Sequence, residues 1–195
     1  MKPIIHITWE YPPFSVGELS NWLYSIIPRL ANYYPLVIIT RGNEDNIFKL
    51  NNLTIYRVGS LHKTHPHILT YAHLLNLDFV RAASNIIHDN GGALLIHSHD
   101  WISSIAAYYI SLYLKCPLII SVYTTEIKRA GKIDSLLKMG IFDIEKKCFE
   151  NADIIIVRDE EIKNHLIADY NIDRNKIFFG RNHDEIISLY RRIIK

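Results

Sequence analysis

The segment that decides the fold is LLIHSHDW, residues 94–101, an apolar run that leads into two histidines, an aspartate and a tryptophan. Successive side chains of a strand alternate between its two faces, so His97 and His99 are predicted to point to the same side. Asp100 follows at the position where a helix would begin, and aspartate is a preferred helix N-cap residue. The segment therefore predicts a buried strand whose carboxyl end presents an imidazole at the edge of a sheet.

Similar apolar runs recur along the chain, at residues 3–9, 36–40, 53–58, 117–123, 153–157 and 176–179. Segments with apolar residues at helical spacing lie between most of them, at 19–33, 67–89, 101–114, 137–148 and 160–170. Unbroken apolar strands separated by helices are typical of a parallel sheet that is covered on both faces. We therefore expect a single doubly wound, Rossmann-like α/β domain with a mostly parallel sheet, and a polar, exposed connection at residues 41–52.

The composition argues against several classes of protein. The 22 basic and 20 acidic residues give a net charge of only +2, which does not suggest nucleic acid as a partner. No apolar segment approaches the roughly 20 residues of a membrane span, and the first apolar run, broken by His6, is too short for a signal peptide. Cys116 and Cys148 lack a CxxC spacing and are expected to be buried, reduced thiols. A cytoplasmic protein without a membrane span is the expectation.

A second segment of interest is the loop EYPPFSVGE, residues 10–18, which follows the first predicted strand. In parallel sheets ligands bind outside the carboxyl ends of the strands, so this loop and residues 97–101 are expected at the same edge. The loop leads into a helix N-terminus, where backbone N–H groups and the helix dipole favour an anion such as phosphate. Gly17 supports such a site, whereas Glu18 adds bulk and negative charge beside it.

A metal site is another interpretation of the histidine pair, because two imidazoles on one strand face and the Asp100 carboxylate could ligate zinc. A metallo-hydrolase loop would have a further histidine just after Asp100, where this chain has Trp-Ile-Ser. A barrel amidohydrolase requires a far longer chain. We therefore expect no bound metal, and we interpret Asp100 chiefly as a helix cap and Trp101 as a packing residue.

These motifs resemble the N-terminal half of the GT-B glycosyltransferases, specifically the glycogen and starch synthases and their close relatives. WEYPPFSVGEL (9–19) looks like the opening loop of that family, which normally has two adjacent glycines before the leucine, and HSHDW (97–101) is similar to its HxHDW motif. SVYTTE (121–126) stands where the family has a T-V-H-x-x-E type segment. IEKKCFENADIIIV (144–157) and NKIFFGRN (175–182) resemble the segments that lead toward its second domain, so the resemblance covers about residues 3–182.

The resemblance implies roles for individual residues. His99 would contact the transferred sugar near the reacting carbon and is the catalytic candidate. Gly17, Glu18 and Tyr123 would lie at the donor diphosphate, although Glu18 and Tyr123 replace a glycine and a histidine that the family usually has. The acceptor side or structural rim of the site would contain Glu10, Tyr11, His97, Asp100, Trp101 and Glu126. No bound metal and no cofactor beyond the nucleotide-sugar substrate is implied.

The chain departs from the family after residue 182. A full GT-B enzyme continues into a second domain that supplies most of the sugar-nucleotide site, whereas here only HDEIISLYRRIIK, residues 183–195, follows. Its apolar residues have helical spacing, so it is predicted to be a helix that packs back on the domain formed by residues 1–182.

Two classes of function stay open at this point. In the first, the chain is the acceptor-side half of a transferase that moves a hexose from a nucleotide sugar, such as UDP-glucose or ADP-glucose, to a glycan acceptor. It would then need a separately encoded donor-domain subunit as its partner. In the second, it is a catalytically inactive carbohydrate-binding or regulatory domain. A homodimer could also form through the face that the missing domain would have covered.

Overall fold

A mostly parallel sheet is the centre of the structure, a computed structural model that describes residues 2–59 and 67–194. Its strands within these ranges are β1 (Ile4–Thr8), β2 (Leu36–Gly42), β3 (Asn46–Leu50), β4 (Leu53–Gly59), β5 (Leu95–His99), β6 (Leu118–Ser121), β7 (Ile154–Val157) and β8 (Ile177–Phe179). They lie side by side in the order β3-β4-β2-β1-β5-β6-β7-β8. Only the β3–β4 pair is antiparallel.

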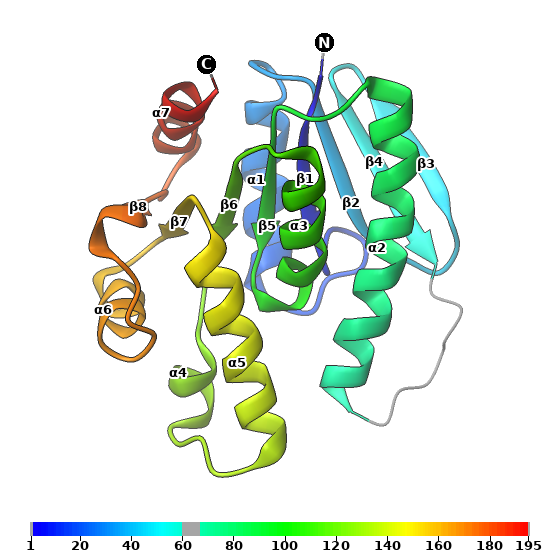
Figure 1. Ribbon diagram of the computed structural model, residues 1–195. Coiled ribbons are helices and arrows are strands. Elements are labelled where there is room, and N and C mark those ends of the chain that lie inside the picture. Colours follow the sequence, from blue (N-terminus) through cyan, green and yellow to red (C-terminus); the bar gives the residue numbers. More distant parts are fainter. Residues whose placement is uncertain (1, 60–66, 195) are drawn as a thin grey trace.

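Helices cover both faces of the sheet, as Figure 1 shows with α2, α3 and α5 in front of it and α1 behind. Their bounds are α1 (Glu18–Leu30), α2 (Ile68–Asn90), α3 (Trp101–Leu114), α4 (Glu126–Ala130), α5 (Leu136–Asn151), α6 (Glu160–Ala168) and α7 (His183–Ile193). Each face of the sheet has its own buried apolar layer, one shared with α2, α3, α5 and α6 and the other with α1 and α7. The predicted doubly wound α/β fold is confirmed.

Helix α2 ends within one residue of the predicted position, and the predicted C-terminal helix is confirmed. Helix α2 stops at Gly91, whose φ of 67° is favourable for glycine and whose N–H donates to the carbonyl of Ile87. Helix α7 buries Ile186, Ile187, Leu189 and Tyr190 in the same apolar layer as α1. The terminal segment therefore packs back on the sheet, as its helical spacing predicts.

Two elements differ from the prediction. Residues 41–52, expected to be an exposed connection, contain strand β3, which pairs with β4 through a tight turn at Asn51, where φ is 51°. All five side chains of β3 are exposed, so the burial pattern that identifies a strand in the sequence is missing. The short helix α4, capped by the Thr125 hydroxyl, was also not predicted. Both elements are too short to show a clear hydrophobic period.

Both cysteines are free, as predicted. Cys148 is buried, as expected, whereas Cys116 is only half-buried, so that part of the prediction was wrong. Across residues 2–59 and 67–194, no helix combines the length and the apolar character needed to cross a bilayer.

Asn76 holds helices α2 and α3 together. Its side-chain amide donates to the carbonyls of Ala72 (2.6 Å) and Ile102 (2.5 Å), and its carbonyl accepts from the N–H of Ala106 (2.7 Å). The side chain is buried, so these bonds have no competition from water. This clamp fixes α3, the helix that begins at the carboxyl end of β5.

Replacing this amide should destabilise the fold strongly. Asn76→Ala removes the hydrogen-bond partner of the buried Ile102 carbonyl and Ala106 N–H. We therefore expect the free energy of unfolding to fall by about 2–3 kcal/mol. Urea denaturation followed by circular dichroism measures the loss. The matched control is Asn85→Ala in the same helix, where the side chain is exposed. Equal losses in the two variants would contradict the clamp.

Candidate functional site

The carboxyl ends of β1, β5 and β6 bring the predicted site segments to one edge of the sheet. Thr8, His99 and Ser121 are register partners on these three neighbouring strands. The opening loop therefore emerges beside residues 99–101, and both lie next to the segment that leads into α4. This arrangement confirms that the two loops share one edge, where parallel α/β sheets bind ligands.

The opening loop is closed around a buried carboxylate. Glu10, 3% exposed, accepts hydrogen bonds from the backbone N–H groups of Val16 (2.6 Å) and Gly17 (2.9 Å). Gly17 is the N-cap of α1 and provides no side-chain cap, and Glu18 is exposed in the first turn. The N–H groups that the sequence suggested for a diphosphate are thus bound to an acidic side chain of the loop itself.

Arg57 of β4 fixes the other half of this loop. Its guanidinium donates to the carbonyls of Tyr11 (2.9 Å) and Pro12, and it lies over the rings of Tyr11 and Phe14. Tyr11 is buried. The loop is therefore held from inside at both ends, and the rim role of Tyr11 stays a prediction.

Behind the edge, three buried histidines form a closed hydrogen-bond network. His99 Nε2 lies 2.9 Å from His6 Nδ1, and His6 Nε2 lies 3.2 Å from the Tyr190 hydroxyl of α7. His97 Nδ1 contacts the same hydroxyl at 2.6 Å, while its Nε2 lies 2.8 Å from the Ser121 hydroxyl. His97 and His99 point to the same side of the sheet, as predicted, with ring centroids 4.3 Å apart.

The remaining nitrogen of the network meets Tyr123. His99 Nδ1 lies 3.1 Å from the Tyr123 hydroxyl, so both nitrogens of this 1% exposed ring have partners. Burial raises the pKa of Tyr123 well above its usual value, so the hydroxyl stays protonated. His99, the predicted catalytic residue, thus lies just inside the edge of the sheet. Tyr123, which follows strand β6, contacts its ring.

Burial keeps these imidazoles neutral. It lowers the pKa of His6 to about 3 and the pKa values of His97 and His99 well below the usual range, with the neighbouring histidines adding to the effect on His97 and His99. Each neutral ring has one N–H donor and one acceptor nitrogen, which suits a network of neutral hydroxyls and imidazoles.

The three histidines are also spaced as a metal site could be. One nitrogen from each of His6, His97 and His99 lies within 4.8 Å of the others. A metal ion would have to replace hydrogen bonds that engage all six ring nitrogens. The geometry therefore fits a hydrogen-bond network better than a metal centre, and the absence of a bound metal stays a prediction.

Asp100 occupies a strained position at the start of α3. Its φ of 65° and ψ of 172° are rare for a residue other than glycine, and its side chain accepts from the N–H of Trp101 (3.0 Å). The predicted cap is confirmed. Burial raises the pKa of its carboxyl to about 7, although nearby Arg129 acts in the opposite direction. A strained carboxyl that titrates near neutrality is a feature often found at functional sites.

A charged cluster next to Asp100 was not found from the sequence. Arg129 of α4 pairs with Glu126 (2.9 Å) and with fully buried Glu145 of α5 (2.7 Å), whose carboxylate also accepts from the N–H of Glu126 and from the Tyr170 hydroxyl. Glu126 was a predicted rim residue. Glu145 was missed in the sequence analysis. It could have been found as a carboxylate among the apolar residues on the buried side of α5, where a charge needs a partner.

An open pocket of about 450 Å³ lies between these groups. Its lining includes Asp100, Arg129, the half-buried Trp9 and Trp101, which is only 4% exposed. Three buried polar atoms near this edge lack a hydrogen-bond partner among the described residues, namely Trp9 Nε1, Thr40 Oγ1 and Arg41 Nε. Aromatic faces beside hydrogen-bonding groups are the lining that many small-molecule sites have.

Comparison with known families gives a match over most of the chain. The model of Glycosyltransferase Family 4 matches residues 19–179. An uncharacterized glycosyltransferase of Methanocaldococcus jannaschii is 27% identical over 177 residues, which are 89% of this chain and 44% of that protein. The chain therefore spans less than half the length of this relative.

Several solved structures have a similar fold. A sucrose-phosphate synthase from Thermosynechococcus elongatus has a TM-score of 0.75 at 15% identity, with 92% of this chain and 47% of that chain covered. Another structure of this enzyme is covered over 100% of both chains, with a TM-score of 0.73 at 16% identity. Anabaena HepE in complex with UDP and glucose has a TM-score of 0.62 at 10% identity, covering 93% and 44%. These identities indicate a common fold only.

The histidine network gives a specific dependence of stability on pH. The folded His6 has a pKa of about 3, and an unfolded histidine has one near 6.5, so below pH 6.5 only the unfolded chain takes up this proton. Each of the three histidines should therefore remove up to about 1.4 kcal/mol of stability per pH unit as the pH falls. The pKa of Asp100 is raised to about 7, so between about pH 7 and pH 4 its carboxyl binds a proton in the folded state and not in the unfolded chain. This proton uptake offsets the destabilising effect of about one of the three histidines.

Urea unfolding at several pH values between 7.5 and 5 should show this loss. We expect His6→Gln to reduce the slope of unfolding free energy against pH by about one proton. His88→Gln is the control, because that side chain is 89% exposed and outside the network. A slope that is unchanged in His6→Gln would show that these histidines are not held neutral.

Proposed function

The chain belongs to glycosyltransferase family 4, and on this premise we propose that it is the acceptor-side half of a hexosyltransferase that uses a nucleotide sugar. The observation that carries the proposal is the family match over residues 19–179, because this range contains the ends of β5 and β6 and the segment before α4. A donor domain, on the same polypeptide or on a separate subunit, would complete the site. UDP-glucose and ADP-glucose are the candidate donors, and a glycan is the candidate acceptor.

The closer relation to glycogen and starch synthases is part of this proposal. It rests on the motifs at residues 9–19 and 97–101, and the positions of both at one edge of the sheet are consistent with it. Within that relation His99 would contact the transferred sugar. The Nδ1 of His99 is hydrogen-bonded to the Tyr123 hydroxyl, so this bond must break before Nδ1 can contact a sugar.

We place the acceptor in the pocket lined by Trp9 and Asp100. The half-buried Trp9 offers aromatic surface to a sugar ring, whereas Trp101 is only 4% exposed, and Asp100 can accept a hydrogen bond from the attacking hydroxyl. In the transfer this hydroxyl oxygen bonds to the anomeric carbon and its proton passes to the Asp100 carboxylate, while the bond from that carbon to the diphosphate oxygen breaks and the nucleoside diphosphate leaves as an anion. Holding the hydroxyl in one orientation lowers the entropic part of the barrier.

The second candidate function is a carbohydrate-binding or regulatory domain without catalysis. One observation favours it: Glu10 occupies the N–H groups of Val16 and Gly17, so a diphosphate could reach them only after this carboxylate moved away. Glu18 adds a further negative charge in the first turn of α1. In this case the chain would bind glycans but not nucleotide sugars, so donor binding separates the two functions.

Glycan binding should depend on Trp9. In ligand-observed NMR with malto-oligosaccharides we expect saturation transfer to the sugar protons, and Trp9→Ala should weaken binding about tenfold by removing one aromatic wall of the pocket. Tyr113→Ala is the control, because this ring is 79% exposed on α3, away from the pocket. Binding that is equally strong in Trp9→Ala would place the acceptor elsewhere.

Donor binding should depend on His99. With UDP-glucose and ADP-glucose we expect a weak signal in the wild-type chain that disappears in His99→Ala, since the imidazole is the proposed sugar contact. His73→Ala, an exposed histidine on α2, is the matched control, and circular dichroism checks that each variant is folded. Glycan binding without any donor binding would support the second function, and no binding of either ligand would contradict both.

A further inference from the structure

An arginine without an acidic partner stands at the carboxyl edge of the sheet. Arg158 directly follows β7, and its guanidinium lies over the indole of Trp22 in α1, 4.3 Å from the ring centroid. The side chain is exposed, and it makes no ion pair or side-chain hydrogen bond with the residues that the structure describes. The N–H donors of this guanidinium are therefore free to bind an anion.

The acidic residues that follow Arg158 in the sequence are engaged elsewhere. Asp159 caps α6 by accepting from the N–H of Ile162 (2.8 Å). Glu160 and Glu161 pair with lysines of α6 and α4. The positive charge at the end of β7 is thus not neutralised by a contact within its own segment.

The strand register places Arg158 next to the proposed sugar contact. Ser121 of β6 and Ile156 of β7 are register partners, so Tyr123 and Arg158, each two residues further on, follow neighbouring strands at the same level. The Tyr123 hydroxyl lies 3.1 Å from His99 Nδ1. Burial raises the pKa of this hydroxyl, and the charge of Arg158 acts on that pKa in the opposite direction, which agrees with their proximity.

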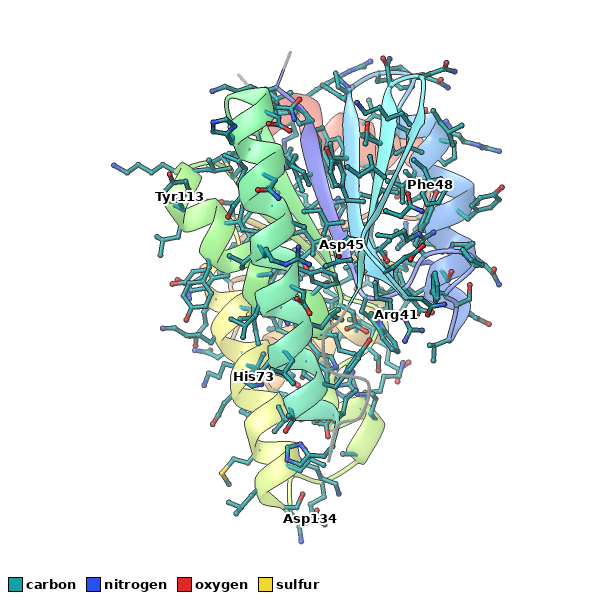
Figure 2. The ribbon with its side chains drawn as sticks, turned by 90° about the vertical axis from the view of Figure 1, so that its right-hand side faces the viewer. Arg41, Asp45, Phe48, His73, Tyr113 and Asp134 are labelled. Atoms are coloured by element: carbon teal, nitrogen blue, oxygen red, sulfur yellow. The ribbon has the colours of Figure 1, made fainter. Side chains whose placement is uncertain are left out.

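Arg158 also lies on the side of the sheet that the start of α1 occupies. Ile156, two residues earlier, packs in the apolar layer that contains α1, and alternate residues of a strand share a face. Figure 2 shows the strands between the α2 layer, where His73 is labelled, and α1 on the other side. Trp22 follows Glu18 by four residues, so the two share one face of α1. Arg158 therefore brings a positive charge to the first two turns of α1.

This charge answers the two features that oppose a diphosphate at the start of α1. Glu10 occupies the N–H groups of Val16 and Gly17, and the exposed Glu18 adds a negative charge in the first turn. A guanidinium can bind two phosphate oxygens side by side, and it needs no backbone N–H groups to do so. The positive charge of Arg158 also offsets the repulsion from Glu18.

A second arginine lies beside the first. Arg181, which follows β8, donates from its Nε to the Arg158 carbonyl (3.3 Å), and its guanidinium lies 3.9 Å from the centroid of the Phe179 ring. Glu185 accepts from the backbone N–H of Arg181 (2.7 Å) and offsets part of this charge. The ends of β7 and β8 together still carry more positive than negative charge, which suits a ligand with several negative charges.

We propose that Arg158 binds the diphosphate of the nucleotide-sugar donor, beside Tyr123, in place of the N–H groups at the start of α1. This role rests on the hexosyl transfer proposed above. When the bond from the anomeric carbon to the diphosphate oxygen breaks, its electron pair stays on that oxygen. The guanidinium then stabilises the added negative charge, while the acceptor oxygen takes the anomeric carbon and gives its proton to Asp100.

Calorimetric titration of the purified chain with UDP tests this role. Arg158→Gln should weaken UDP binding about tenfold, because it removes a charge-assisted pair of hydrogen bonds. Arg191→Gln is the matched control: Arg191 is also exposed over an aromatic ring, that of Tyr33, but this ring lies beyond the C-terminal end of α1. Equal losses in the two variants would contradict the role of Arg158, and circular dichroism checks that both are folded.

Glu18→Gln makes the opposite change at the same place. Removing this exposed negative charge should tighten UDP binding about threefold, because it ends the repulsion of the diphosphate. Uridine, which has no phosphate, should not distinguish the wild type from either variant. UDP binding that is unchanged or weaker in Glu18→Gln would place the diphosphate elsewhere.

UDP-glucose separates the failure of this role from the failure of the transfer itself. Equal binding of UDP-glucose to the wild type and to Arg158→Gln would overturn the role of Arg158 and leave the proposed use of a nucleotide sugar standing. A wild-type chain that binds glycan but neither UDP nor UDP-glucose would overturn both.

Discussion

The hydrogen bonds among His6, His97, His99 and Tyr190 are the constraint on which the rest of the structure depends. Three polar rings from two adjacent strands lie in an otherwise apolar layer, and unpaired polar groups there would cost several kcal/mol. Each ring nitrogen meets a partner, so the layer tolerates them. Because burial also holds the rings neutral, the network needs no counter-charge.

This network links the C-terminal helix to the site. The Tyr190 hydroxyl of α7 contacts His6 and His97, His6 contacts His99, and His99 contacts Tyr123 at the edge of the sheet. The position of the proposed sugar contact therefore depends on the docking of a helix from the other end of the chain. On the opposite face, Asn76 fixes α3 behind strained Asp100. The edge is thus supported from both layers of helices.

Much of this arrangement follows from local sequence. The alternation of a strand places His97 and His99 on one side, and the residue type of Asp100 marks the start of α3. What the sequence could not provide are contacts between distant segments. His6 stands as a single polar residue in an apolar run, and Tyr190 is 184 residues away from it. Strand β3 was missed because an exposed edge has no burial pattern.

Some residues predicted at the site hold the fold together. Glu10 was predicted at the rim, but the structure shows that its carboxylate accepts hydrogen bonds from the N–H groups of Val16 and Gly17 in its own loop. His99 belongs to the buried network, and its Nδ1 is hydrogen-bonded to the Tyr123 hydroxyl. The pocket itself is lined by other residues, among them Trp9, Asp100 and Arg129.

The measurement that tests the central claim most directly is an NMR titration of the imidazole resonances of His6, His97 and His99 in the folded chain. The closed network predicts that all three rings stay neutral from pH 7.5 down to at least pH 5. Protonation of any of the three near pH 6.5 would contradict the network and the link that it makes between α7 and the site.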